Sequence, residues 1–180
     1  MDYDEPNGVV HQRMELHMLM CGEQVNARPN VVVMNDDLDY TLVLQLDLPH
    51  AEAEPQLIAA AIAAHYENNR RRRQLGFPTV VTKVYPGIVM IGSTPTFYLI
   101  PVSEALAVAV CQGRYPSEPT VVKKLSTPVD DMREYIEKGM EYLPNRRIIF
   151  QLLGAFKQTT MLKLCNNMSL LAMLFPQRRH

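Results

Sequence analysis

The clearest pattern in the chain is the alternation of apolar and polar residues between positions 27 and 49. A β-branched run at 31–33 precedes the short polar residues 35–37, which suit a tight turn, and a second apolar run follows. The pattern predicts a β-hairpin. One face of its second strand would carry Tyr40, Leu42, Leu44, Leu46 and Leu48. The other face would carry Thr41, Val43, Gln45 and Asp47. We expect the turn acids Asp36, Asp37 and Asp39 to be solvated.

The remaining segments predict helices and a second hairpin. A helix is expected over 9–23, where Met and Leu recur and Gly22 stands near the end. The longest helix should run over 56–75, with Pro55 in its first turn and Gly76 after it. A hairpin is predicted within 80–102, followed by a short helix over 104–111 that Ser103 caps. Further helices are expected over 128–142 and 146–164, after a possible strand at 120–125.

This order of elements predicts a mixed α/β (α+β) fold, with a small mixed β-sheet packed by helices. We expect residues 1–8 to form a flexible arm and residues 9–112 to form the α/β core. Residues 113–128, which contain three prolines, should form an extended connection. Residues 129–180 should supply C-terminal helices that pack on the same domain.

Composition narrows the class of protein. The 180 residues are 47% hydrophobic and 21% charged, as in a single globular domain. A net charge of −1 argues against a surface built entirely for polyanions. The N-terminus does not resemble a secretion signal, and no window suits a membrane span. Cys21, Cys111 and Cys165 fit neither a disulfide framework nor a zinc site. We therefore expect an intracellular protein, in cytoplasm or nucleus, without a membrane partner.

The hairpin and the helix after it resemble the core of the PD-(D/E)XK nuclease superfamily, a restriction-endonuclease-like fold. In that superfamily an aspartate begins one strand and an acid-x-lysine pair lies on the next, so that carboxylates hold Mg²⁺ near an activated water. Here Asn30 stands at the place of the aspartate, and Gln45 and Asp47 stand at the places of the acid and the lysine. Gln56-Leu57 is similar to the glutamine-leucine start of the helix in several branches of the superfamily. The chain also resembles uncharacterised intracellular domains of mushroom-forming fungi.

The resemblance implies a catalytically degenerate nuclease-like domain that acts as a nucleic-acid or protein binding module. Its degenerate motif positions would be Asn30, Gln45, Asp47 and Gln56, and it would need no metal or other cofactor. One alternative is an active Mg²⁺-dependent nuclease that uses displaced carboxylates, such as Asp47 with Glu52 or Glu54. Another alternative is a structural, partner-binding protein with no nucleic-acid role.

Four consecutive arginines, Arg70, Arg71, Arg72 and Arg73, form the strongest charge feature. Successive helical residues point 100° apart, so the four arginines do not form one stripe. They are candidates for phosphate contacts, or they form a solvated helix end that is favourable for the helix dipole. His65 falls on the apolar side of the same helix, where we expect it to be a packing residue. No histidine pair has the i, i+4 spacing of a helical zinc site.

Overall fold

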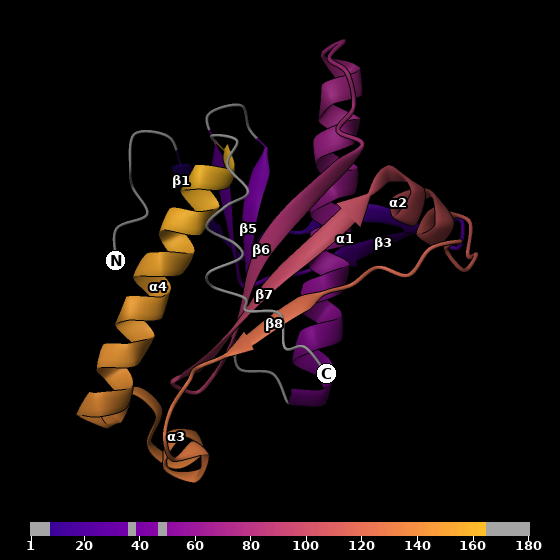
Figure 1. Ribbon diagram of the computed structural model, residues 1–180. Coiled ribbons are helices and arrows are strands. Elements are labelled where there is room, and N and C mark those ends of the chain that lie inside the picture. The colour runs from indigo at the N-terminus through magenta and orange to yellow at the C-terminus, as the bar shows by residue number, and fades with distance from the viewer. Residues whose placement is uncertain (1–7, 36–38, 47–49, 165–180) are drawn as a thin grey trace.

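The chain forms a six-stranded mixed sheet and a separate two-stranded hairpin (Figure 1). The computed structural model describes residues 8–35, 39–46 and 50–164. The large sheet has the strand order β1-β4-β5-β6-β7-β8, and β2 pairs with β3. The strands are β1 Gly8–Gln12, β2 Leu16–Met20, β3 Glu23–Ala27, β4 Val31–Asn35, β5 Tyr40–Leu46, β6 Thr82–Ile91, β7 Thr94–Ser103 and β8 Lys123–Ser126.

Helices cover both faces of the large sheet, as Figure 1 shows for α1 and α4. The helical elements are α1 His50–Gln74, α2 Glu104–Cys111, α3 Met132–Lys138, the 3₁₀ turn η1 Gly139–Glu141 and α4 Leu143–Leu164. Helix α1 connects β5 to β6, which pair in parallel, whereas the neighbouring pairs are antiparallel. A mixed sheet packed by helices confirms the predicted fold class. Within the described ranges, no helix combines the length and apolarity that crossing a membrane requires.

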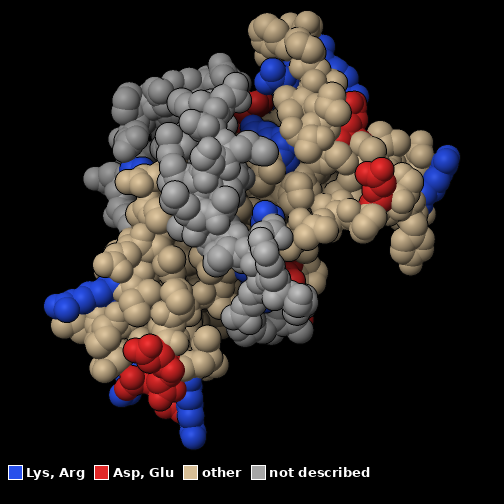
Figure 2. All heavy atoms as spheres, in the orientation of Figure 1, with Lys and Arg blue, Asp and Glu red and all other residues tan. Residues whose placement is uncertain are grey.

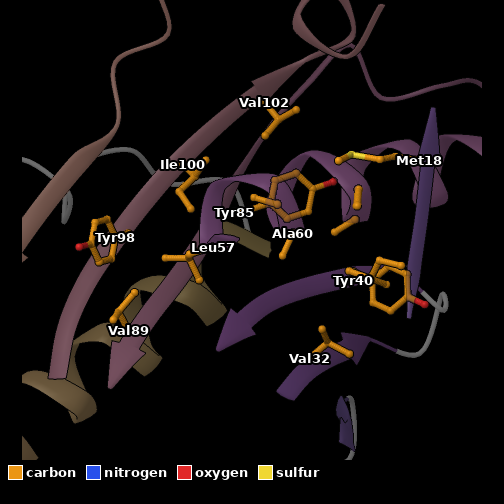
Figure 3. Close-up of a cluster of buried hydrophobic side chains, with 14 of the residues drawn as sticks. Met18, Val32, Tyr40, Leu57, Ala60, Tyr85, Val89, Tyr98, Ile100 and Val102 are labelled. Atoms are coloured by element: carbon orange, nitrogen blue, oxygen red, sulfur yellow. The ribbon is translucent and has the colours of Figure 1, made fainter. Parts of the chain in front are cut away.

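Strand β7 shows how the sheet divides the core into two layers. Its residues Tyr98, Ile100 and Val102 pack on the α1 side, whereas Phe97 and Leu99 pack on the α4 side. This alternation follows from the two-residue period of a strand. Figure 3 shows the α1 side, where Leu57 and Ala60 of the helix lie among side chains of the sheet.

Small residues let α1 lie close to the strands. Five of its alanines are at most 1% exposed: Ala53, Ala60, Ala61, Ala63 and Ala64. Gly87 of β6 is a second close approach, because a Cβ built there would lie 2.9 Å from Cδ2 of the buried Leu57. The helix–sheet spacing on this side therefore depends on the absence of a side chain at position 87.

The predicted helix over 9–23 is wrong, since this segment contains β1, β2 and the start of β3. Met and Leu have high helix propensity, but Leu16 and Met18 lie on the same face of a strand, and both are buried in the core on the α1 side. Cys21 and Gly22 form the two-residue turn between β2 and β3, with φ of 54° and 83°. Such turns need positive φ at both central residues, which is why a glycine stands there.

The predicted face of the second hairpin strand is also wrong. Tyr40 packs on the α1 side of the sheet, but Leu44 packs on the α4 side. The pairing of β4 with β5 shifts between Val33 and Met34, where β5 carries one extra residue. A β-bulge reverses the alternation beyond it, so residues on either side of it do not share the predicted face.

Other boundaries differ from the predictions in smaller ways. Strand β6 runs through Pro86 without a break, α1 begins at His50 before Pro55, and α4 begins at Leu143. The helix predicted over 128–142 is shorter, because it starts after Asp131 caps α3 and ends at Gly139, whose φ is positive. The predicted strand at 120–125 is β8, displaced to 123–126. Of the arm expected at 1–8, Gly8 instead begins β1, where it pairs with Asn35, and residues 1–7 lie outside the described residues, as does the end of the chain at 165–180.

We predict that Gly87→Ala lowers the free energy of unfolding by about 1–3 kcal/mol, because the new methyl group overpacks against Leu57. Gly154→Ala is the matched control: Gly154 lies in α4, where a Cβ would meet nothing within 4 Å, and this change should stabilise the protein by about 0.5–1 kcal/mol. Urea unfolding measures both changes. Equal effects of the two substitutions would contradict the close approach of α1 to β6.

Candidate functional site

The backbone brings two of the degenerate motif positions together. Val31 pairs with Leu44, so Asn30 and Gln45, each one residue beyond that pair, lie at the same end of β4 and β5. Asn30 is half-buried, and its carbonyl accepts a hydrogen bond of 2.9 Å from the Arg13 amide. Asp47 lies outside the described residues, as does the Gln45 side chain.

The carboxylates beside these positions do not form a metal site in the described ranges. Gln56 is exposed on α1. Glu52 is exposed, whereas Glu54 Oε2 accepts hydrogen bonds of 2.9 Å from Tyr98 Oη and from Lys124 Nζ. Among the residues that the structure describes, no three His, Cys, Asp or Glu side chains gather as metal ligands.

The four arginines separate into two pairs. Arg71 and Arg72 turn toward the sheet: Arg71 donates to Tyr40 Oη at 2.8 Å, and Arg72 Nη1 lies 3.1 Å from Asp39 Oδ2. Arg70 and Arg73 are exposed, and their Nε atoms donate to Glu67 Oε2 and to the Asn69 carbonyl. Figure 2 shows basic side chains around the upper end of α1. The cluster is therefore not uniformly solvated.

Asp39 is buried rather than solvated, which corrects the expectation for this turn acid. Its side chain lies 3.1 Å from Arg72 Nη1 and 3.6 Å from Lys83 Nζ. Two cations compensate the cost of burying this carboxylate. Asp36 and Asp37 lie outside the described residues.

A buried polar network on α1 is the feature that the sequence analysis missed. Asn68 accepts from the Tyr40 amide at 2.8 Å and donates to the Tyr40 carbonyl at 3.1 Å. Asn69 pairs in the same way with the amide and the carbonyl of Val80, at 2.8 and 3.0 Å. Each side-chain amide thus pairs with both the N–H and the C=O of one backbone residue, as a residue of a neighbouring β-strand does. The signal in the sequence is the run Glu67-Asn68-Asn69, which follows helix positions that are otherwise apolar.

His65 is joined to Asn69 directly and to Asn68 through Tyr85, and it is 1% exposed. Because Val80 fixes the orientation of Asn69, the second N–H of that amide donates to His65 Nε2 at 3.1 Å. The ring proton therefore belongs on Nδ1, which lies 3.3 Å from Tyr85 Oη. The structure buries His65 with two hydrogen-bond partners, as expected for a packing residue.

Burial keeps this histidine neutral. Burial and, to a smaller extent, the charge of Lys83 together lower the pKa of His65 to about 4, against a small opposing effect of Asp39. Burial also raises the pKa of Tyr85, against a smaller opposing effect of the hydrogen bond from Asn68. The two rings meet edge to face, with centroids 5.9 Å apart. Both groups are uncharged near neutral pH.

Two adjoining pockets lie along α1, where the β2–β3 hairpin and α2 approach it. The larger has a volume of about 370 Å³, and Arg70, Arg73 and Glu104 line it beside apolar residues of α2. The smaller has a volume of about 190 Å³ and lies against β2 and β3. Leu19, Tyr66 and Arg70 line both pockets. The two pockets, together with the part of α1 at 65–73 that lines them, form the candidate binding site.

Backbone contacts fix one wall of this site. The amides of Cys21 and Gly22, in the turn between β2 and β3, donate to the carbonyls of Val110 and Cys111 at 3.0 and 2.8 Å. These carbonyls lie at the C-terminal end of α2, where the Val110 carbonyl also accepts from the Gly113 amide at 3.1 Å. The hairpin thus caps α2, and the two elements flank α1 together.

Comparison with protein-family models, with curated proteins and with solved structures finds no match to this chain.

We predict that the free energy of unfolding falls by about 3 kcal/mol between pH 6.5 and pH 4 through His65. In this window the unfolded chain binds the imidazole proton and the folded chain does not, so stability decreases as the pH falls. Urea unfolding at several pH values measures the slope of the free energy of unfolding against pH. Between pH 4 and pH 6.5 this slope should correspond to one bound proton less in His65→Gln than in the wild type. An identical pH dependence in both proteins would contradict a histidine held neutral by burial.

Proposed function

We propose that this protein is a nuclease-like domain without a working catalytic metal site, and that it binds nucleic acid. The order β4, β5, α1, β6 supports the nuclease-like part, because it supplies the hairpin, the packed helix and the following strand that the PD-(D/E)XK resemblance implies. The observation that carries the binding part is the pair Arg70 and Arg73, which lines an open pocket on α1. An intracellular location remains part of the proposal.

The residue types at the motif positions support the loss of catalysis. Magnesium sites in proteins usually rest on carboxylates, and Asn30 and Gln45 offer neutral amides at the shared end of β4 and β5. The displaced-carboxylate alternative would need Asp47 with Glu52 or Glu54. Glu54 Oε2 already accepts from Tyr98 and Lys124, so a metal ion at this oxygen would compete with both donors. A binding role is the better supported of the two.

The exposed arginines support an anionic partner. A guanidinium carries five N–H donors in a planar fork. Arg70 uses Nε and Nη2 on Glu67, whereas Arg73 donates through Nε to the Asn69 carbonyl, which leaves the Nη groups of this exposed side chain for phosphate contacts. Arg71 and Arg72 are committed to Tyr40 and Asp39. Glu104 adds one opposing charge to the pocket. We therefore expect a small number of phosphate contacts and an affinity that depends strongly on salt.

We predict that Arg73→Ala weakens binding of labelled single-stranded RNA and lowers the slope of log affinity against log salt by about 0.7. Arg133→Ala is the matched control, because Arg133 lies on α3, 89% of its side chain is exposed, and it does not line the pocket. Fluorescence anisotropy over about 50–200 mM salt measures both slopes. Absence of binding to RNA and to DNA at the lowest salt would overturn the proposal in favour of a protein partner.

We predict that the purified protein leaves plasmid DNA intact in the presence of Mg²⁺ or Mn²⁺, because amides replace the motif acids. Thermal melting should likewise show no shift when either metal is added, since a ligand that binds only the folded state raises the melting temperature. Cleavage that disappears in Asp47→Ala would establish the displaced-carboxylate nuclease instead.

A further inference from the structure

Two cysteines meet where the β2–β3 turn contacts the end of α2. Cys21 is the first residue of that turn and is exposed, whereas Cys111 is the last residue of α2 and is half-buried. Both thiols are free. The two residues are far apart in the sequence, so only the fold brings them together.

Backbone hydrogen bonds set the separation of these two residues. The Cys21 amide donates to the Val110 carbonyl at 3.0 Å, and the Gly22 amide donates to the Cys111 carbonyl at 2.8 Å. With standard backbone dimensions, the first bond holds the Cα atoms of Cys21 and Cys111 within about 7 Å of each other. Cysteines in a disulfide usually have Cα atoms about 4.4–6.8 Å apart. The backbone therefore brings the pair within the reach of a disulfide.

The Cys21 side chain lies against the chain that follows Cys111. A Cβ built at Gly113 would be 3.1 Å from Cys21 Sγ and 3.5 Å from Cys21 Cβ. The Gly113 amide donates to the Val110 carbonyl, which is also the acceptor of the Cys21 amide. The sulfur of Cys21 therefore faces the end of α2, two residues beyond the other cysteine.

The turn itself gives no reason for a cysteine at position 21. Within the described residues, Arg13 and Cys21 are the non-glycine residues with positive φ, and the φ of Cys21 is 54°. Two-residue hairpin turns of this kind favour Asn, Asp or Gly, which tolerate positive φ. An unfavourable residue at such a position points to a role for its side chain.

We propose that Cys21 and Cys111 are a redox modification site, at which a reversible disulfide links the β2–β3 hairpin to α2. Main-chain hydrogen bonds join these elements in the reduced protein, and the disulfide adds a covalent bond at the same joint. Cys111 also lines the larger pocket, so oxidation changes one wall of the candidate binding site. Intracellular disulfides are usually transient and redox-sensing, which fits a pair of free thiols. Formation of the bond does not depend on nucleic-acid binding.

Glutathione disulfide is an oxidant of the class that this reaction needs. The thiolate of the exposed Cys21 attacks one of its sulfur atoms, which forms a mixed disulfide and releases one glutathione. The Cys111 thiolate then attacks the Cys21 sulfur, which forms the Cys21–Cys111 bond and releases the second glutathione. Two electrons pass from the protein thiols to glutathione disulfide, and the two thiol protons pass to the released glutathione molecules. An excess of glutathione reverses both steps.

Oxidation of the full chain by glutathione disulfide tests the pairing. In the variant Cys165→Ser, which removes the third thiol, a thiol assay should show the loss of both remaining thiols. Non-reducing peptide mapping should then find residues 21 and 111 in linked peptides, and this linkage should be lost when oxidation is carried out in urea. Cys21→Ser and Cys111→Ser in the same background are the matched controls, and each should stop at a mixed disulfide with one glutathione. Glutathione on both cysteines of Cys165→Ser, or linkage of either cysteine to Cys165 in the wild type, would overturn the proposal.

Hydrogen exchange tests whether the bond holds the joint closed. The amides of Cys21 and Gly22 donate across the joint, so their exchange requires the hairpin and α2 to separate. Exchange of peptides that contain these amides should be slower in oxidised than in reduced Cys165→Ser, whereas exchange in α3 should not change. Oxidised Cys111→Ser in the same background, which carries only the mixed disulfide, should show no slowing. Equal exchange in the oxidised and reduced forms of Cys165→Ser would overturn the proposed link between the hairpin and α2.

Discussion

Two adjacent side-chain amides, Asn68 and Asn69, hold the second half of α1 in place. Each completes a pair of hydrogen bonds with the backbone of another segment, Tyr40 on one side and Val80 on the other. These segments begin β5 and precede β6, the two strands that α1 connects. Because buried backbone groups need partners, loss of either amide would leave two of them unsatisfied. The position of the helix against the sheet therefore depends on polar bonds as well as on alanine packing.

The properties of the candidate site follow from this attachment. The amides leave one N–H each for Tyr85 and His65, and the bond to His65 Nε2 fixes the proton of this buried neutral ring on Nδ1. The attachment also sets the rotation of the last turns of α1. In that rotation Arg72 meets Asp39, while Arg70 and Arg73 line the pocket. The four consecutive arginines thus divide into two that bond to the sheet, Arg71 and Arg72, and two that are exposed, Arg70 and Arg73.

Residue patterns predicted those parts of the fold in which one periodicity dominates. The alternation of β7 and the alanines of α1 each have one reasonable reading, and the structure has both elements. The segment that contains β2 misleads because Leu16 and Met18 suit a helix or a strand. In the structure the segment is a strand because the turn at Cys21 and Gly22, with positive φ at both residues, pairs it with β3. The face of Tyr40 could not be predicted either, since one extra residue in β5 reverses the alternation.

The candidate site was less accessible to sequence reasoning than the fold. Asn30 and Gln45 do lie at one end of neighbouring strands, because hairpin register is a local property. The partners of Glu67, Asn68 and Asn69 are different: the two asparagines bond to segments that lie well apart from them in the sequence. A polar run in an apolar helix signals buried bonds, but it does not say to which residues they go.

The capping of α2 by the β2–β3 turn uses only main-chain atoms on both sides. Natural variation in the side chains of Val110 and Cys111 can therefore proceed without altering that joint, provided that positions 21 and 22, with φ of 54° and 83°, keep residues that tolerate positive φ. In divergent copies of this protein, the hairpin and α2 could keep their places beside α1 while the side chains that line the two pockets change, so that ligand preference could evolve separately from architecture.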